Sequence, residues 1–339
     1  MIPINEFKPI SRLQVEEHML TRSKFPVIDA HNHLSRTKDV EGVLRSMDEY
    51  NVRMIVDLDG YPGDAGKYQL EHYVAPHPDR FTIFTQIDAS RVDEPGFARE
   101  VENRISDCVS KGSSGIKFLK WLGLRTCDSS GRMLKPDDKR LKPIWEAAAR
   151  WNIPVTIHIG DPIAFFDPIS SVNERYEELI EHPDWSFADP KFYRFEELLE
   201  AQHNLLRDNP ETRFIVAHVG SIAENLKRVG QMLDLYPNMY VDTAERIAEL
   251  GRQPYSSREF ILKYQDRVLY GTDLIPNHDN IVGNYRFFET SDEYFQYNSW
   301  YEHNQGRWNI YGINLPNDVL KKVYFANALK VIPKLKEFY

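Results

Sequence analysis

Residues 25–34 read FPVIDAHNHL, an apolar run that passes into alternating titratable residues. The apolar part has the composition of a buried β-strand, and Asp29, His31 and His33 then follow at every second position. Because alternate side chains of a strand lie on one face, we expect these three to point the same way, so that two imidazoles reach one common point. That is the geometry of a chelate, and the rest of the chain must supply the remaining ligands.

Further runs rich in Val, Ile, Phe and Thr recur along the chain. With the first run, the predicted strands are 26–30, 53–58, 81–87, 115–119, 154–159, 213–218, 239–243 and 268–272. Segments with helical periodicity, such as 97–111 and 142–151, lie between them. This alternation is typical of βα units, and eight units most economically close as an α/β fold of the (β/α)8 TIM-barrel type. A doubly wound open sheet is the alternative, but no glycine-rich phosphate turn follows the first strand.

The composition of the chain narrows the classes of function that the protein can have. The 339 residues carry a net charge of −9, which argues against a broad nucleic-acid footprint and favours a small-molecule substrate. Only Cys108 and Cys127 are present, and no apolar run is long enough to span a bilayer, so we expect a cytoplasmic protein without a membrane partner. No linker or repeat divides residues 1–339, which we interpret as a single domain, and we expect a homo-oligomer.

Two predicted connections are unusually long and rich in aromatic residues. Residues 161–190 follow the fifth strand and carry Phe165, Phe166, Tyr176, Trp185 and Phe187. Residues 276–315 follow the eighth and carry Tyr285, Phe287, Phe288, Tyr294, Phe295, Tyr297, Trp300, Tyr301, Trp308 and Tyr311. Long loops in a compact domain are usually functional. We expect these inserted loops to lie over the C-terminal face of the barrel, either as local packing or as a lid that lines the substrate site.

Ligand-type residues also stand at the ends of later strands. His158 ends the fifth strand, His218 the sixth, and Asp273 follows the eighth. In a barrel these positions meet at the C-terminal face, where such enzymes work. Imidazoles and a carboxylate are the ligand set expected for zinc, with manganese or iron as alternatives. A catalytic site of this kind keeps one position open for a water molecule whose pKa the metal lowers.

With these residues in this order, the chain resembles the amidohydrolase-related branch of the amidohydrolase superfamily. That branch also contains aminocarboxymuconate semialdehyde decarboxylase and resorcylate-type decarboxylases. The resemblance runs from VIDAHNH to the final LKKVYFANALKVI. It implies one divalent metal ion held by His31, His33, His158 and Asp273, with His218 as a catalytic imidazole outside the ligand set and Asp273 contributing to catalysis as well.

The sequence departs from the branch in ways that bear on the reaction. One decarboxylase of the branch has an arginine shortly after strand two that holds a substrate carboxylate, whereas this chain has DLDGYPGDAG at 57–66. Lys117 lies in the fourth strand, where binuclear relatives carry a carboxylated lysine that bridges two metals. A salt bridge of Lys117 with Asp29 or with a substrate anion is the alternative.

Two further residues are candidates for substrate binding. Arg246 follows the seventh strand and is able to hold a substrate carboxylate bidentately, or to form a rim salt bridge with Glu245 or Glu249. Asp59 follows the second strand and either contacts substrate hydroxyls or forms a turn before Gly60.

We therefore predict a metal-dependent hydrolase that attacks the carbonyl of a small amide, lactone or ester with metal-activated water. A metal-dependent non-oxidative decarboxylase of a small carboxylic acid is the first alternative. A non-catalytic barrel that binds a small molecule through its aromatic loops is the second.

Overall fold

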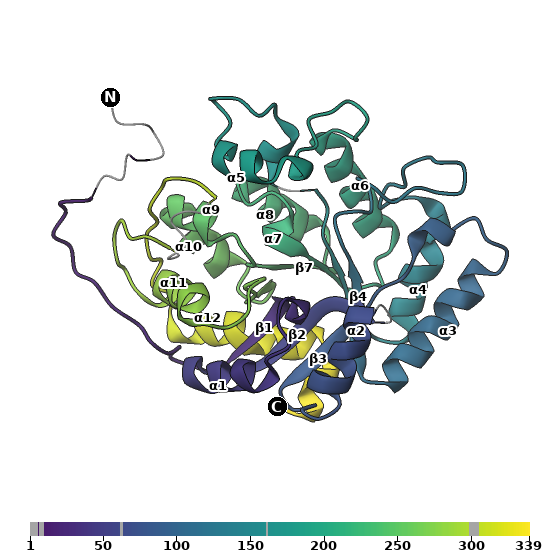
Figure 1. Ribbon diagram of the computed structural model, residues 1–339, viewed down its shortest axis with the longest axis horizontal. Helices are drawn as coiled ribbons and strands as arrows, with labels where there is room; N and C mark the ends of the chain where they lie inside the picture. Colours follow the sequence, from purple (N-terminus) through teal and green to yellow (C-terminus); the bar gives the residue numbers. More distant parts are fainter. Residues whose placement is uncertain (1–5, 7–9, 62–63, 161, 298–304) are drawn as a thin grey trace.

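The computed structural model describes residues 6, 10–61, 64–160, 162–297 and 305–339. Eight parallel strands form one sheet in the order β1-β2-β3-β4-β5-β6-β7-β8. The strands are β1 Val27–Asn32, β2 Val52–Tyr61, β3 Phe81–Thr85, β4 Ser113–Phe118, β5 Val155–Ile157, β6 Phe214–Val216, β7 Met239–Asp242 and β8 Val268–Leu269. This arrangement confirms the predicted TIM barrel (Figure 1).

Backbone hydrogen bonds bring the two edges of the sheet together. The amide of Ala30 donates to the carbonyl of Tyr270 at 3.0 Å, and the amide of Asp273 donates to the carbonyl of His31 at 2.7 Å. The residues after β8 thereby reach the end of β1, so the first and last candidate ligand segments are neighbours.

The helices lie between the strands, as the predicted βα alternation requires (Figure 1). They are α1 Val40–Tyr50, α2 Asp64–Gln69, α3 Phe97–Ser110, α4 Lys142–Arg150, α5 Tyr176–Glu181, α6 Phe195–Asp208, α7 Ala217–Gly220, α8 Leu226–Leu235, α9 Ile247–Arg252, α10 Pro254–Lys263, α11 His278–Glu289, α12 Asn317–Lys321 and α13 Asn327–Val331. In α3 the buried residues Phe97, Val101, Ile105 and Cys108 recur every three or four positions, so one apolar stripe faces the sheet.

The predicted strand positions are correct, but several strands are shorter than predicted. β8 comprises only Val268–Leu269 instead of 268–272, because the chain turns toward β1 and reaches a left-handed backbone at Asp273, with φ of 64°. β6 ends at Val216, before His218, where the backbone is again left-handed. His218 and Asp273 thus follow their strands instead of extending them, which frees their side chains from the regular pleat.

Among the described residues, no helix is long and apolar enough to cross a membrane.

Candidate active-site cavity and metal centre

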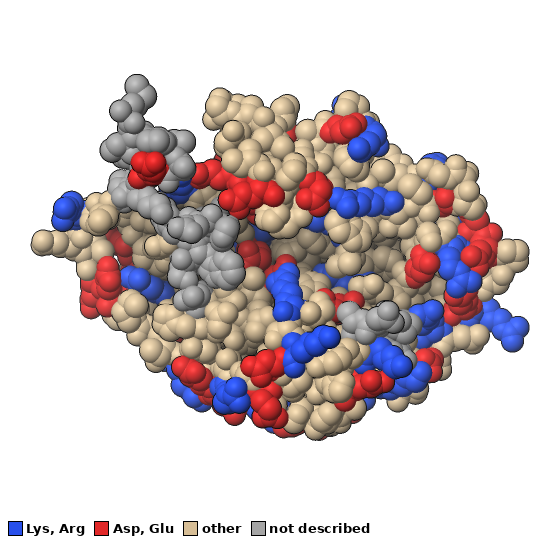
Figure 2. Space-filling view, viewed as in Figure 1, with Lys and Arg blue, Asp and Glu red and all other residues tan. Residues whose placement is uncertain are grey.

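A cavity of about 470 Å³ opens where the strands end. Figure 2 shows this face of the molecule hollowed below α5, with acidic and basic side chains around the hollow. The residues that line the cavity are His33, Arg36, Lys120, His158, Pro162, Phe165, Arg175, Glu178, Glu181, His182, Trp185, His218, Glu245, Arg246, Asp273, Leu274, Asn280 and Gln305. The predicted residues His33, His158, His218, Arg246 and Asp273 are therefore brought together at one site.

His31 in β1 and His33, directly after it, converge on a single carboxylate, as their spacing predicts. Nε2 of His31 lies 3.9 Å from Oδ2 of Asp273, and Nε2 of His33 lies 3.7 Å from Oδ1 of the same residue. On the opposite side of each ring, Nδ1 of His31 is 2.9 Å from Asp242 and Nδ1 of His33 is 2.8 Å from Asp59. A carboxylate only accepts, so both Nδ1 atoms carry the proton and both Nε2 atoms present a lone pair toward Asp273.

His218 is held in a comparable way on a strained backbone. His218 and Val219 have φ of 57° and 55°, an uncommon conformation that is especially costly for a β-branched valine. Nδ1 of His218 lies 2.8 Å from the carbonyl oxygen of Ala244, and its backbone amide donates to Asp242 at 3.0 Å. Because a carbonyl oxygen only accepts, the proton of the neutral ring is on Nδ1 and the basic nitrogen is Nε2.

Asp242, the last residue of β7, is a site residue that sequence reasoning missed. Its carboxylate accepts hydrogen bonds from Nδ1 of His31 and from the amides of His218 and Ala244. Burial raises the pKa of Asp242, while electrostatic interactions with His218 and Lys117 and the amide hydrogen bonds act in the opposite direction. Asp242 therefore fixes the positions of two cavity histidines from behind. The signal in the sequence was an aspartate at the end of a predicted strand, MYVD, directly before Thr243.

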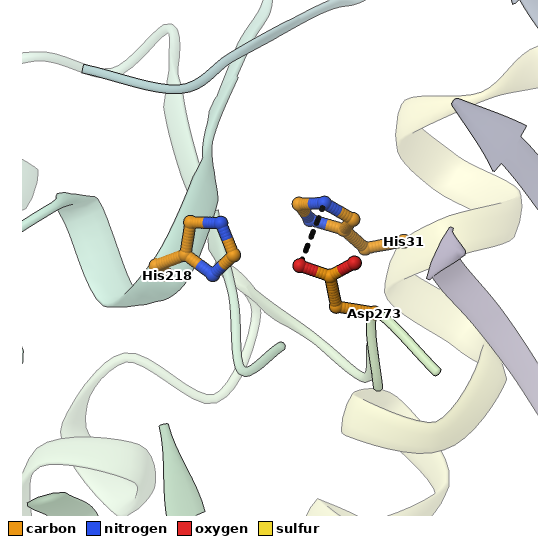
Figure 3. Close-up of side chains that lie close together, drawn as sticks. All are labelled: His31, His218 and Asp273. Atoms are coloured by element: carbon orange, nitrogen blue, oxygen red, sulfur yellow. Dashed lines mark ion pairs between the residues drawn. The ribbon is translucent and has the colours of Figure 1, made fainter. Parts of the chain in front are cut away.

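The ligand atoms of His31, His218 and Asp273 all lie within 4.8 Å of one another (Figure 3). The ring of His158 is 4.2 Å from that of His218, centroid to centroid. Burial raises the pKa of Asp273, but electrostatic interactions with His33, His31 and Arg36 outweigh burial and lower it overall. Asp273 is thus an ionised carboxylate at neutral pH, in the centre of an imidazole cluster.

Lys117 lies against this cluster. Its buried Nζ is 3.4 Å from Nε2 of His31. Burial lowers the pKa of His31 and the neighbouring ammonium lowers it further, so His31 is neutral, as a metal ligand must be. Asp29, which the strand pattern places on the face of His31, instead accepts hydrogen bonds from Thr272 and Asn32, and burial raises its pKa to about 7. Asp29 therefore connects β1 to the segment after β8.

Besides Lys117, the other two predicted substrate-binding residues, Arg246 and Asp59, occupy different places. Arg246 is 6% exposed and lines the cavity, and its guanidinium donates to the backbone carbonyl of Glu245 at 2.6 Å. Asp59 instead lies behind His33, where it also accepts from the amide of Ser35 at 2.5 Å. Its position is that of a residue that orients His33.

Arg36 and Glu245 also line the cavity. The sequence did not single out Arg36, and it suggested Glu245 only as a salt-bridge partner of Arg246 at the rim. Arg36 pairs with Oδ1 of Asp273 at 3.1 Å. Glu245 accepts from the amide of Gln305 at 2.9 Å, and burial, followed by repulsion from Asp273, raises its pKa to about 7. A single sequence offers no pattern for either contact, because both partners come from distant parts of the chain.

The two aromatic-rich connections have different roles. Phe165 and Trp185 of the first connection line the cavity. The hypothesis of a substrate-lining lid is wrong for Tyr285, Phe287 and Phe288 of the second, which are 0% exposed and pack in the hydrophobic core. Trp300 and Tyr301 lie outside the described residues.

A model of the family described as amidohydrolase matches residues 28–334. The chain belongs to this family. The match includes every predicted ligand, and it confirms the resemblance seen in the strand-end residues. No curated protein sequence matches the chain.

Solved structures share the fold at low sequence identity. A 2,6-dihydroxybenzoate decarboxylase from Rhizobium is 15% identical with a TM-score of 0.57, and the match covers 91% of this chain and 99% of that one. A dihydroxybenzoic acid decarboxylase from Polaromonas, with bound manganese and 2-nitroresorcinol, is 17% identical with a TM-score of 0.54, covering 91% and 97%. A probable 2-pyrone-4,6-dicarboxylic acid hydrolase from Acinetobacter baumannii is 9% identical with a TM-score of 0.53, covering 91% and 100%.

The amidohydrolase family is metal-dependent, and the donor set of this chain fits a divalent cation. His31 and His33 each have Nδ1 occupied by a carboxylate, which is the usual arrangement of metal-bound imidazoles. Nε2 of His31 lies 3.9 Å from Oδ2 of Asp273 and Nε2 of His33 lies 3.7 Å from Oδ1, so the two imidazoles and the carboxylate are close enough to bind one cation together.

Proposed function

We propose that this protein is a metal-dependent hydrolase of a small amide, lactone or ester. The observation that carries the proposal is the orientation of His218, whose Nδ1 is committed to the carbonyl of Ala244, so that its basic nitrogen is Nε2 in a cavity that also contains Asp273. A fixed neutral imidazole of this kind is suited to general base catalysis.

The residues that would hold the cation are His31, His33, His158 and Asp273, and we propose zinc, with manganese or iron as alternatives. When bound, such a cation supplies Lewis acidity that polarises the substrate carbonyl and lowers the pKa of water. Nε2 of His218 accepts a proton from the attacking water as its oxygen adds to the carbonyl carbon. The same nitrogen then returns the proton to the leaving nitrogen or oxygen as its bond to that carbon breaks.

Asp242 supports this chemistry without contacting the reacting atoms. Its carboxylate bridges Nδ1 of His31 and the amide of His218, which fixes the ligand and the base relative to each other. Preorganisation of this kind avoids reorganisation during the reaction.

Non-oxidative decarboxylation is the second candidate, and Arg246 favours it. This nearly buried guanidinium lines the cavity and provides a desolvated cation for a substrate carboxylate. Carbon dioxide would leave from that carboxylate, and the electron pair of the broken carbon–carbon bond would stay on the substrate. Nε2 of His218, after taking up a proton from solvent, would deliver it to that carbon. The two decarboxylase structures that share the fold support this candidate as well.

Two assays on the metal-loaded protein separate the candidates. For a hydrolase we expect acid release from lactones or esters, followed by pH-stat titration, or release of an amine from amides. For a decarboxylase we expect carbon dioxide release from hydroxybenzoates. The variant His218→Asn should lose about a hundredfold or more in rate while it keeps the metal content of the wild type. Asp273→Asn should lose both, because an amide is a poorer ligand than a carboxylate.

Loss of metal from His218→Asn would place this residue among the ligands and contradict its role as the base. Metal binding without turnover of either substrate class would favour the third possibility raised by the sequence, a binding barrel.

A further inference from the structure

Lys120 lies on the cavity wall, two residues beyond the end of β4. Its Nζ is 5.4 Å from the ring centroid of Phe165, 5.5 Å from that of Trp185 and 5.7 Å from that of Phe187. All three rings belong to the connection after β5, whereas the lysine belongs to the connection after β4. Two separate segments therefore build one arrangement around a single ammonium group.

The three rings hold the ammonium group of Lys120 in position but do not neutralise its positive charge. The negative face of an aromatic ring attracts a cation within about 6 Å of its centroid, and the attraction is larger where water is excluded. The rings are themselves fixed: Trp185 stacks on His182 with centroids 4.1 Å apart, and Phe187 packs on Phe166 at 5.5 Å. A preorganised ammonium on an aromatic wall is suited to bind an anion that enters the cavity, because little side-chain entropy remains to be lost.

The position of Lys120 in the barrel shows which part of a substrate it would meet. In the strand order β1 to β8, β4 is diametrically opposite β8. Asp273 follows β8 and Lys120 follows β4, and both line the same cavity. An anionic group at Lys120 would thus lie across the cavity from the imidazole–carboxylate cluster, with the apolar faces of Phe165 and Trp185 beside the connecting part of the ligand.

We infer that Lys120 is a specificity-determining residue that binds a carboxylate at the end of the substrate remote from the reacting group. The substrate class is then a small carbonyl compound with a second, remote carboxylate and an apolar middle. This inference rests on the proposed function for the identity of the reacting group. Glu181 lines the same cavity, and Glu178 does so while paired with Arg175 at 3.0 Å, so the cavity lining carries charges of both signs. A mixed environment of this kind suits one carboxylate better than a multiply charged phosphate.

The test is calorimetric binding of paired acids that differ by one carboxylate, measured on the metal-loaded protein. The pairs are benzoate against isophthalate and terephthalate, hexanoate against adipate, and octanoate against suberate, so that several spans are sampled. We expect at least one diacid to bind about tenfold or more tightly than its monoacid, because hydrogen bonds to charged groups are among the stronger ones. Lys120→Met should abolish this preference while monoacid binding stays within about threefold of the wild type. Lys120→Arg, which keeps a cation, should retain most of it.

Lys135→Met is the matched control. Lys135 also lies over an aromatic ring, that of Tyr193 at 4.5 Å, but it does not belong to the cavity lining described above. This variant should keep the preference of the wild type. The inference is wrong if no diacid binds more tightly than its monoacid, or if Lys120→Met keeps the preference. A diacid preference in a protein that lacks turnover would contradict the proposed function and leave the role of Lys120 intact.

Discussion

The connections after β5 and β8 have similar aromatic-rich compositions and different roles. Both are long and rich in aromatic residues. The first places Phe165 and Trp185 on the cavity, whereas the second forms α11 and buries Phe287 and Phe288 completely. Aromatic density therefore predicts that a loop is ordered, but not whether its rings face a ligand or the core. The helical periodicity of the second connection makes the difference, because it packs Phe288 against Tyr270, directly after β8, and Tyr324 of the C-terminal segment.

Of the changes that would distinguish the two connections, we expect the largest effect from a substitution that lowers the free energy of unfolding. Phe288 is 0% exposed and packs against Tyr270 and Tyr324. Phe288→Ala should lower the free energy of unfolding by about 3–5 kcal/mol, through lost burial and the cavity left behind. Chemical denaturation measures this change. A loss below about 1 kcal/mol would mean that this connection is not part of the core.

Trp185→Ala should act mainly on binding. Trp185 is only partly buried and lines the cavity, so we expect benzoate to bind up to about tenfold more weakly to the metal-loaded variant, by calorimetry. Trp151→Ala is the control, because this tryptophan is 37% exposed and its indole donates to Glu102 at 2.8 Å. Equal affinities in wild type and Trp185→Ala would remove the distinction between the two connections.

Tyr285→Phe probes the buried connection more finely. The hydroxyl of Tyr285 donates to the carbonyl of Tyr50 at 2.9 Å, which ties α11 to the end of α1. Removing this donor leaves a buried acceptor without this hydrogen bond, so the free energy of unfolding should fall by about 1 kcal/mol. Substrate binding should not change. A variant as stable as the wild type would show that packing alone holds α11 in place.

The smallest expected effect concerns the contact between His18 and Asp292, which lies in the second connection. The hydrogen bond from Nδ1 of His18 to Asp292, at 2.5 Å, raises the pKa of His18 above 6.5. Burial raises the pKa of Asp292, but the hydrogen bonds from His18 and Arg286 outweigh it and lower the pKa below 3.8. The contact is therefore fully present below pH 6.5 and above pH 3.8, and it weakens as the pH rises through the raised pKa of His18 or falls through the lowered pKa of Asp292.

Hydrogen exchange at the amide of His18, which donates to Asp292 at 2.7 Å, measures this contact. Its protection factor should fall as the pH rises through the raised pKa of His18, and protection should be lost at all pH values in Asp292→Ala, which has no side-chain acceptor. A protection factor that stays constant from pH 5 to pH 9 would show that the imidazole charge does not matter there.

Much of the fold and part of the site could be predicted from the sequence, because both depend on local patterns. The apolar runs placed all eight strands, and strand-end positions brought His33, His158, His218 and Asp273 to one cavity, since parallel strands share one carboxyl edge. Their exact strand limits could not be predicted, because the left-handed residues after β6 and β8 are stabilised by long-range contacts.

The positions and roles of the remaining site residues depend entirely on long-range contacts. Asp242 acts through His31, 211 positions away in the sequence, and Lys120 meets rings of the following connection. Asp59 was predicted to reach substrate because it follows a strand, yet it pairs with His33 of the neighbouring strand. A single sequence specifies which residues reach the mouth of the barrel. It does not specify which of them face the cavity and which stand behind a ligand.

The most direct test of the proposed metal centre is the metal content of the purified protein, measured by elemental analysis on the wild type, His31→Ala and the exposed control His72→Ala. We predict about one divalent ion per chain in the wild type and in His72→Ala, and loss of the ion from His31→Ala, because one inner-sphere imidazole and its carboxylate support are removed. Full occupancy in His31→Ala, or two ions per chain in the wild type, would contradict a single metal ion held by the histidines of β1.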